Sequence, residues 1–455
     1  MTATLSDPSR APRTQASHRA RRPAGAGQAA RVARRRTLNT PGTLRALLAG
    51  LVLLSLAWGA FGGWVASQHS SAAGALVTVD EPLSGDARQM YQSIANADVT
   101  ITSALLASST PPLSQVQRFR QDVKNAAYDD TVVLREAGGG QAETAALDAI
   151  GTGLPVYSED VAKAEASYAL GHRLLGGSFL QVASEEAHLV LLPNAQTVFT
   201  QENDALAAAS SQATDLVTII AALVLGVITA IVLYRAQRWL ARRTNRVLSV
   251  GLALTSVLLV GSALWLAASF LAARSDLDHA IGQGSGPAAK LALADIDVQQ
   301  IRGDAVLNVI SRSGNTSFQE NFQTTSTQVG PGNGSLLSAA AAAQGSDGNG
   351  ATLVAAAERE APAWYAANNT VYSQGQASAY AQEANTVLGS AAAAGYQALN
   401  GDINGAINAD EAVFTSAASS GQQVLDPLEV VVIVAALLMA LGCGWAFSRR
   451  LAEYR

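Results

Sequence analysis

Four uninterrupted apolar runs dominate the pattern of hydrophobic and polar positions along the chain. Each run is close to the roughly 20 residues that a helix needs to cross the hydrocarbon core of a bilayer, and none contains a charged side chain. Four such runs predict transmembrane helices rather than buried core helices. With a few flanking residues, the predicted spans are residues 43–66, 216–234, 247–273 and 430–447.

The first long segment between spans, residues 67–215, shows a helical period instead. Apolar residues recur there at steps of three and four in four successive stretches. The stretches are separated by the Pro and Gly motifs at 111–112, 138–140 and 176–177. Four antiparallel helices with short connections predict a four-helix bundle. Pro155 and Pro193 fall inside the last two stretches, where we expect kinks.

The second long segment, residues 274–429, repeats this plan less regularly. Helical periodicity runs from 278 to 312, resumes at 352–373 and continues into a long helix that ends before the last span. Residues 330–350 are rich in Gly, Ser and Ala and are expected to form a mobile connection. The predicted fold class is an all-α membrane protein with four transmembrane helices and two extracytoplasmic, sensor-like helical bundles.

Arginine is concentrated on one side of the predicted membrane. The chain has 30 basic and 35 acidic residues and a net charge of -5, but ten arginines precede the first apolar run, which begins at about Leu47, and five lie among the 12 residues 235–246. Because cytoplasmic loops carry an excess of Lys and Arg, both termini and this short loop are predicted to be cytoplasmic. The protein is then a multi-pass protein of the cytoplasmic (inner) membrane. Segments 67–215 and 274–429, with charge sums of -11 and -10, lie outside.

The ends of the chain are predicted to be short cytoplasmic tails. Residues 1–42 are rich in Arg, Ala, Pro and Gly and indicate a disordered basic tail, and 448–455 form the other. Small residues near Ala72 also permit a cleaved signal peptide, but the first apolar run exceeds a 7–15-residue signal core, so a retained anchor is expected. The tail favours anionic lipid over nucleic acid, because no aromatic or fold signature accompanies its arginines.

Catalytic chemistry is missing from the sequence. A single cysteine excludes a disulfide scaffold, and the absence of ionisable groups in the spans disfavours ion-coupled transport. Glu185 and His188 form one Glu-x-x-His motif, whereas a di-iron bundle needs two. We interpret this motif as an exposed i,i+3 pair. The chain is therefore predicted not to be an enzyme and to bind neither metal nor cofactor.

A few charged residues outside the membrane are candidate contacts for a ligand or a binding protein. Arg118 and Arg120 are notable because basic residues are scarce there and arginine recognises carboxylates with a planar fork. Pairing with neighbouring acids such as Asp122 is the favoured alternative, and Arg302 has the same ambiguity. A faint repeat of Asn-Ala-Asp-Val at 96–99 and Asp-Ile-Asp-Val at 295–298 suggests duplication. It adds the aspartates of the two copies as candidates, Asp98 and Asp297.

On the cytoplasmic side, the only surfaces available for output are the short loop, the basic N-terminal tail and the C-terminal tail. We expect a partner to contact the arginines of this loop. They are Arg235, Arg238, Arg242, Arg243 and Arg246.

Several stretches resemble the actinobacterial GlnX-type membrane proteins. They include residues 96–102, the Pro-Pro break before Arg118, and residues 154–157, 178–184, 191–193 and 301–304, with the last Arg-flanked span. The resemblance implies a four-span partner of a glutamate/glutamine-binding lipoprotein outside and of a soluble serine/threonine kinase inside. It implies that the chain relays glutamate, aspartate or glutamine availability across the membrane.

Two other functions remain open on the sequence. The chain would also suit an envelope scaffold that does not switch, or an accessory subunit of a solute importer. A homodimer is possible, but no specific interface is visible in the sequence.

Overall fold

The computed structural model describes most of the chain after residue 39. The described residues are 40–136, 138, 140–244, 250–311, 317–329, 334–344, 348–376 and 379–452. Every regular element among them is a helix. Four of the helices are long and apolar enough to cross a membrane. The predicted all-α class with four membrane helices is confirmed.

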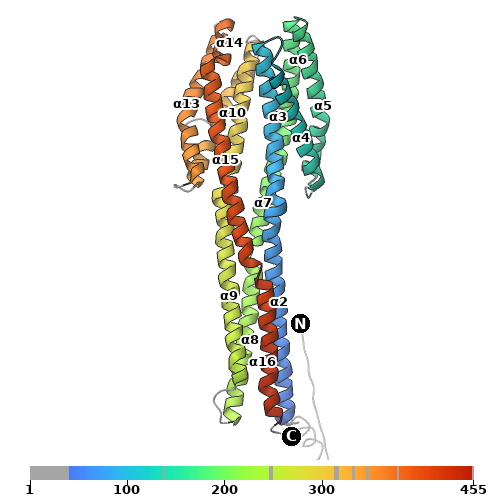
Figure 1. Ribbon diagram of the computed structural model, residues 1–455, viewed down its shortest axis with the longest axis vertical. Helices are drawn as coiled ribbons and strands as arrows, with labels where there is room; N and C mark the ends of the chain where they lie inside the picture. Colours follow the sequence, from blue (N-terminus) through green and yellow to red (C-terminus); the bar gives the residue numbers. More distant parts are fainter. Residues whose placement is uncertain are drawn as a thin grey trace, which may run out of the picture.

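The four membrane helices contain the predicted spans as far as these are described. They are α2 (Thr40–Ala75), α8 (Leu216–Thr244), α9 (Val250–Ala280) and α16 (Leu428–Ala452). Helix α2 begins three residues before the expected boundary at residue 43. The start of α2, the end of α8, the start of α9 and the end of α16 lie together at one end of the molecule (Figure 1). The predicted placement of this end in the cytoplasm remains a prediction.

Small residues allow α2 and α16 to pack closely. A Cβ atom added at Gly59 would fall on the methyl group of Ala436, and one at Gly63 would approach Ile433 to 3.0 Å. Such steps of small residues let membrane helices approach closely. By contrast, a Cβ atom at Gly50 on the same helix would meet nothing within 4 Å.

The difference in free space between Gly59 and Gly50 predicts how an added methyl group at each position changes the stability of the membrane region. We expect Gly59→Ala to force α2 and α16 apart and to destabilise the membrane region by about 1–3 kcal/mol, as overpacking does. The matched control Gly50→Ala should behave like the wild type. Thermal unfolding of both variants in lipid nanodiscs measures the effect, and equal midpoints would contradict the close packing.

The first exterior segment forms the four predicted helices. They are α3 (Glu81–Ala107), α4 (Leu113–Glu136), α5 (Gln141–Ala169) and a last helix made of α6 (Arg173–Glu186), η2 (Ala187–Leu191) and α7 (Leu192–Ala213). The kink expected near Pro155 does not divide α5, which continues through it as one helix. The irregularity expected at Pro193 is present as the π-helical segment η2 just before it.

The second exterior segment has the same order of elements with additional short helices. Helix α10 (Gly286–Ser311) follows α9 through η3 (Ile281–Ser285). The remaining helices are α11 (Ser317–Val329), α12 (Leu336–Ala343), α13 (Asn349–Gln376), α14 (Tyr380–Leu388) and α15 (Ser390–Leu425). Helix α12 corrects the expectation of a mobile connection at 330–350 for residues 336–343, whereas residues 330–333 and 345–347 lie outside the described part. Ser335 caps it by accepting the backbone N–H of Ser338, and Leu337 is buried.

Three five-residue π segments occur where the chain enters or passes through the bundles. Segment η1 (Leu76–Asp80), η2 and η3 each end two residues before a proline, namely Pro82, Pro193 and Pro287. A proline cannot donate to the carbonyl group four residues earlier, and its ring crowds that carbonyl. In each case that carbonyl lies inside the π segment, so the wider turn is explained by the sequence. Helices α3 and α10 thereby continue directly from the spans α2 and α9.

The other two membrane helices, α8 and α16, are each separated by a short break from the neighbouring bundle helix, α7 or α15. Helix α2 contacts both breaks. The His69 ring nitrogens lie 2.8 Å from the Ala213 carbonyl oxygen and 2.9 Å from Thr218 Oγ1, across the junction of α7 and α8. The adjacent Ser70 hydroxyl donates to Asp426 Oδ1 at 2.7 Å, at the junction of α15 and α16. One turn of α2 therefore holds both junctions in place.

Candidate functional site

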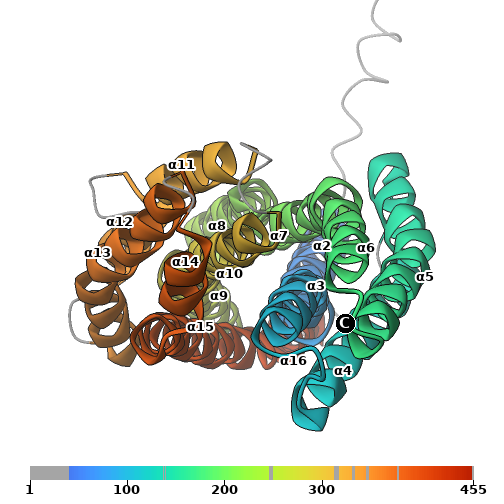
Figure 2. The ribbon, with the colours of Figure 1, turned by 90° about the horizontal axis from the view of Figure 1, so that it is seen from above.

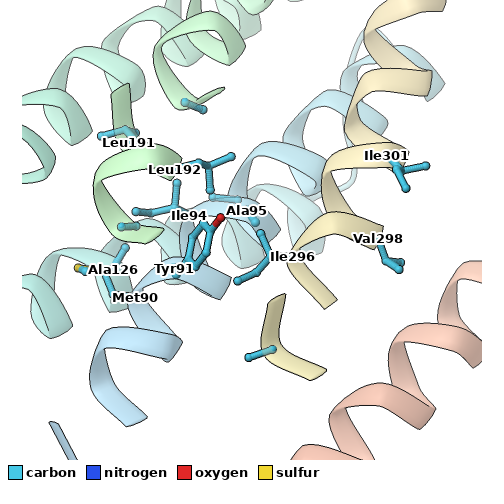
Figure 3. Close-up of a cluster of buried hydrophobic side chains, with 14 of the residues drawn as sticks. Met90, Tyr91, Ile94, Ala95, Ala126, Leu191, Leu192, Ile296, Val298 and Ile301 are labelled. Atoms are coloured by element: carbon cyan, nitrogen blue, oxygen red, sulfur yellow. The ribbon is translucent and has the colours of Figure 1, made fainter. Parts of the chain in front are cut away.

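The two exterior bundles share one core, which is centred on α3 and α10. Buried side chains of both bundles belong to a single apolar cluster. Figure 3 shows Tyr91 and Ile94 of α3 lying between Leu192 on one side and Ile296 of α10 on the other. The two bundles are thus packed against each other, and polar groups buried among these apolar residues require partners.

An imidazole lies between two buried carboxylates at this interface. His188 of η2 has its Nε2 atom 3.3 Å from Asp98 Oδ2 and its Nδ1 atom 3.5 Å from Asp304 Oδ1. Asp98 belongs to α3 and Asp304 to α10, so His188 connects the two bundles. Ser184 donates to Asp98 Oδ1 at 2.7 Å, and Asn321 of α11 donates to Asp304 Oδ2 at 3.0 Å. We call Asp98, His188 and Asp304 the carboxylate–imidazole triad.

The electrostatics of the triad favour a charged imidazole. Burial lowers the pKa of His188, but the hydrogen bond to Asp98 and the charge of Asp304 outweigh it and raise the pKa to about 9. Burial raises the pKa of Asp304 to about 6, although His188 and Asn321 act in the opposite direction. Near neutral pH His188 therefore carries a positive charge between these two carboxyl groups. Apart from the contacts with His188, neither Asp98 Oδ2 nor Asp304 Oδ1 has a hydrogen-bond partner.

A second polar cluster joins α3, α10 and α15. Asp295 accepts hydrogen bonds from Gln92 at 3.1 Å, from Gln299 at 2.7 Å and from Asn404 at 3.0 Å, and also from Asn400. Burial raises the pKa of Asp295 to about 7 in spite of these amides, which lower it. The cluster fixes α15 against the α3–α10 pair.

An ion pair lies beside this cluster. Arg88 of α3 pairs with Glu411 of α15, and it also donates to Gln92 at 3.1 Å. It provides a further charged contact between the first bundle and the second.

The five candidate contacts outside the membrane have different surroundings. Asp98 is a member of the triad and is 1% exposed. Asp297 is largely buried, and burial raises its pKa to about 7. The Arg302 side chain lies over the Tyr396 ring, 4.8 Å from its centroid. Arg118 and Arg120 are exposed on α4.

The charges of the two exposed arginines lower the pKa of different acids. Burial raises the pKa of Asp122 to about 6 while the charge of Arg118 lowers it. The favoured pairing of Arg118 with Asp122 stays a prediction. Burial likewise raises the pKa of Glu165 on α5 while Arg120 lowers it. The charge of Arg120 therefore acts on an acid of its own bundle. The charge of Arg118 also acts on Tyr396 of the second bundle.

The candidate cytoplasmic contacts lie at the membrane end. Arg235, Arg238 and Arg242 are exposed on the last turns of α8. The helix includes Arg243, but its side chain and the whole of Arg246 lie outside the described part.

The sequence-based interpretation of His188 was wrong. It is largely buried at the bundle interface and does not form an exposed pair with Glu185. Two signals indicated this position. Leu180, Ser184 and Leu191 are spaced at helical steps on the buried face, and His188 lies four residues after Ser184. In addition, Pro193 widens the turn that contains it.

The faint sequence repeat also differs from the structural one. Asp98 lies 18 residues after the end of η1, and Asp304 lies 19 residues after the end of η3. Asp304, not Asp297, therefore occupies the place that corresponds to Asp98. The repeat is one of architecture, with each half running from span to π segment to interface helix.

A metal site is not indicated in the parts of the chain described above. Within them, no group of three or more His, Cys, Asp and Glu side chains has an arrangement that could hold a metal ion. We therefore treat the triad as an electrostatic contact between bundles.

Comparison with known protein families gives a match to the first bundle. Residues 72–211 match the family model described as the actinobacterial sensor domain. The match covers the first bundle from the end of α2 to the end of α7, and it includes Asp98 and His188. Neither a curated protein nor a solved structure matches the chain. A sensing or signalling role is therefore supported for the first bundle.

Proposed function

We propose that the chain is a transmembrane signal transducer. It relays the availability of glutamate, aspartate or glutamine from an extracytoplasmic binding protein to a cytosolic serine/threonine kinase. The sensor-domain match to the first bundle supports the sensing part. The ligand class and both partners come from the resemblance of the sequence to GlnX-type proteins.

One observation carries the transducer part of the proposal. Helices α3 and α10 provide Asp98 and Asp304 to the triad, and both continue through a π segment into a span. A change in how the bundles pack therefore moves α2 and α9 as nearly rigid elements. A ligand produces such a change only by binding one arrangement better than the other.

The surface of the first bundle supports docking of an exterior protein. Large exposed apolar side chains outside the membrane helices are confined to the first bundle and η1, and the described part of residues 286–425 has none. Three of them, Leu175, Val182 and Leu189, follow one another at intervals of seven residues on α6 and η2. Exposed apolar patches of this kind mark interaction sites.

The negative charge of the chain favours a different protein, and not a second copy of the chain, as the partner that docks on this surface. Both exterior segments are strongly acidic, and the exposed Glu185 lies within the stripe. Two copies would bring like charges together, which costs affinity. We therefore assign the stripe to the binding protein, with basic residues around its apolar contact.

The proposed output surface gives a direct test. Replacing the five arginines at 235–246 with glutamine should abolish co-purification of the kinase, because the loop loses its positive charge. A variant with lysine at the same five positions keeps the charge that sets topology and should retain binding. Kinase binding that survives the glutamine variant in its correct topology would contradict the proposal.

A cellular measurement separates the proposed function from the alternatives. Phosphorylation of the kinase's target should respond to added glutamate, aspartate or glutamine only when the chain is present. An equal response in cells that lack the chain would favour a scaffold. Loss of amino-acid uptake itself would favour an accessory subunit of an importer.

A further inference from the structure

An open cavity lies at the junction of α7 and α8, beside α2. Its volume is about 440 Å³, within the range of roughly 300–1,000 Å³ that is usual for small-molecule sites. Helix α2 runs beside both α7 and α8, as the side view in Figure 1 and the view from above in Figure 2 show. Residues of all three helices line the cavity, among them Gln68 and Ala72 of α2, Gln212 of α7 and Thr218 of α8.

The cavity lies at the surface of the membrane, on the side that carries the bundles. The predicted spans end at residue 66 in α2 and begin at residue 216 in α8, so the lining residues lie at the edge of the hydrocarbon core. Exposed apolar side chains continue from the cavity toward the membrane. They are Trp64 of α2, one turn before the cavity, and Val217 and Ile220 of α8. A polar cavity above an apolar surface matches the two parts of a phospholipid.

The charge of the lining favours a cationic group. Asp215 is the one carboxylate that lines the cavity, and in the described part of the chain no lysine or arginine lines it. Asp215 Oδ1 accepts the backbone N–H of Val217 at 3.1 Å, whereas Oδ2 has no hydrogen bond within the described residues. The ring nitrogens of His69 are occupied, because they lie 2.8 Å from the Ala213 carbonyl oxygen and 2.9 Å from Thr218 Oγ1. The carboxylate is therefore left to bind a donor from outside the chain.

We propose that the cavity binds the head group of a phospholipid that carries a primary ammonium group, as phosphatidylethanolamine does. The ammonium group donates to Asp215 in a charge-assisted hydrogen bond. The side-chain amides of Gln68 and Gln212 donate to the phosphate ester, and the acyl chains lie along Val217 and Ile220. A quaternary ammonium group has no N–H to donate, and Asp215 repels an anionic head group.

A lipid at this position acts on the connection between the first bundle and its second span. Residues 214–215 separate α7 from α8, whereas α2 continues through η1 into α3. A head group that contacts α2, α7 and α8 together stabilises one arrangement of this junction relative to others. The inference goes beyond the proposed function, and its test needs neither the binding protein nor the kinase.

Native mass spectrometry of the full chain tests the site. The chain is released from nanodiscs that contain equal amounts of phosphatidylethanolamine, phosphatidylcholine and phosphatidylglycerol. We expect it to retain phosphatidylethanolamine in preference to the other two lipids. Equal retention of all three, or a preference for phosphatidylglycerol, would overturn the proposal.

A soluble compound distinguishes a lipid from a free ligand with the same head group. Glycerophosphoethanolamine has the ammonium group and the phosphate but no acyl chains. It should not displace the retained lipid at an equal concentration, because it lacks the contacts with the apolar surface of α8. Displacement at that concentration would overturn the assignment of the cavity to a lipid.

The variant Asp215→Asn tests the role of the carboxylate. Asparagine caps a helix about as well as aspartate, so the variant keeps the hydrogen bond to Val217 and loses the charge. Loss of a charge-assisted hydrogen bond should lower the preference for phosphatidylethanolamine over phosphatidylcholine about tenfold. Asp204→Asn is the matched control, because Asp204 is exposed on α7 and does not line the cavity. An unchanged preference in Asp215→Asn would overturn the proposal.

The variant Ala72→Leu fills the cavity without a change of charge. It should also lower the preference for phosphatidylethanolamine, and a wild-type preference would show that the lipid binds elsewhere. Thermal unfolding in nanodiscs of phosphatidylcholine alone checks that both variants fold. In phosphatidylethanolamine nanodiscs the wild type should gain stability from the bound lipid. An equal gain in Asp215→Asn would contradict the site.

Discussion

Replacement of His188 with glutamine is expected to loosen the two exterior bundles from each other. The change leaves Asp98 Oδ2 and Asp304 Oδ1 facing each other without the imidazolium, and neither atom has another hydrogen bond. Removing one partner of a buried charge contact typically costs about 3–5 kcal/mol, because the remaining charge stays buried. We therefore expect a loss of this size in the free energy of unfolding of the exterior region.

Thermal unfolding of the full chain in nanodiscs measures this loss. The matched control is His172→Gln, because His172 is exposed at the turn between α5 and α6. Adding Asp304→Asn to the His188 variant removes one of the two facing carboxylates and should restore part of the stability. A double variant no more stable than His188→Gln alone would show that the loss does not come from carboxylate repulsion.

The variant His188→Gln also tests whether the triad couples the positions of the two bundles. His188 lies between α3 and α10, the two helices that continue into the spans α2 and α9. If the triad sets the relative position of these helices, His188→Gln should alter the distance between spin labels placed on α4 and α15. Unchanged distances together with a lowered stability would restrict the triad to a structural role.

Much of the fold follows from local sequence signals. The apolar runs identify the four membrane helices, and the helical period with its Pro and Gly breaks identifies α3 to α7. These features depend on residues that are close in sequence. Helix α12 was missed because Gly and Ser surround it, although Ser335 provides a cap and Leu337 a buried contact.

The candidate site could be predicted only in part, because it depends on contacts between residues far apart in sequence. Asp98, Asp297 and Arg302 were selected from their composition and spacing. His188 was not, because a single Glu-x-x-His motif on a helix does not reveal which face is buried. Its partners Asp98 and Asp304 lie 90 and 116 residues away in the chain. Only the packing of α3 against α10 brings them together.

Replacement of Asp297 with asparagine is expected to stabilise the protein, and increasingly so as the pH rises. Burial raises the pKa of Asp297 from 3.8 to about 7. The folded chain thus holds this proton more tightly than the unfolded chain, and the ionised carboxylate opposes folding. This cost is absent below the unfolded pKa and complete above pH 7. A difference of about three pKa units corresponds to as much as about 4 kcal/mol.

The surroundings of Asp297 explain why no other group offsets this cost. Its charge adds to the effect of burial in raising the pKa of Tyr91 and of Tyr365. The Tyr365 hydroxyl is itself buried without a hydrogen-bond partner. Unfolding midpoints of Asp297→Asn should exceed those of the wild type at pH 8 and converge with them near pH 4. Asp204→Asn, at an exposed position on α7, should show no such pH dependence. A constant difference across this range would mean that the pKa of Asp297 is the same in the folded and the unfolded chain, and it would contradict the raised pKa.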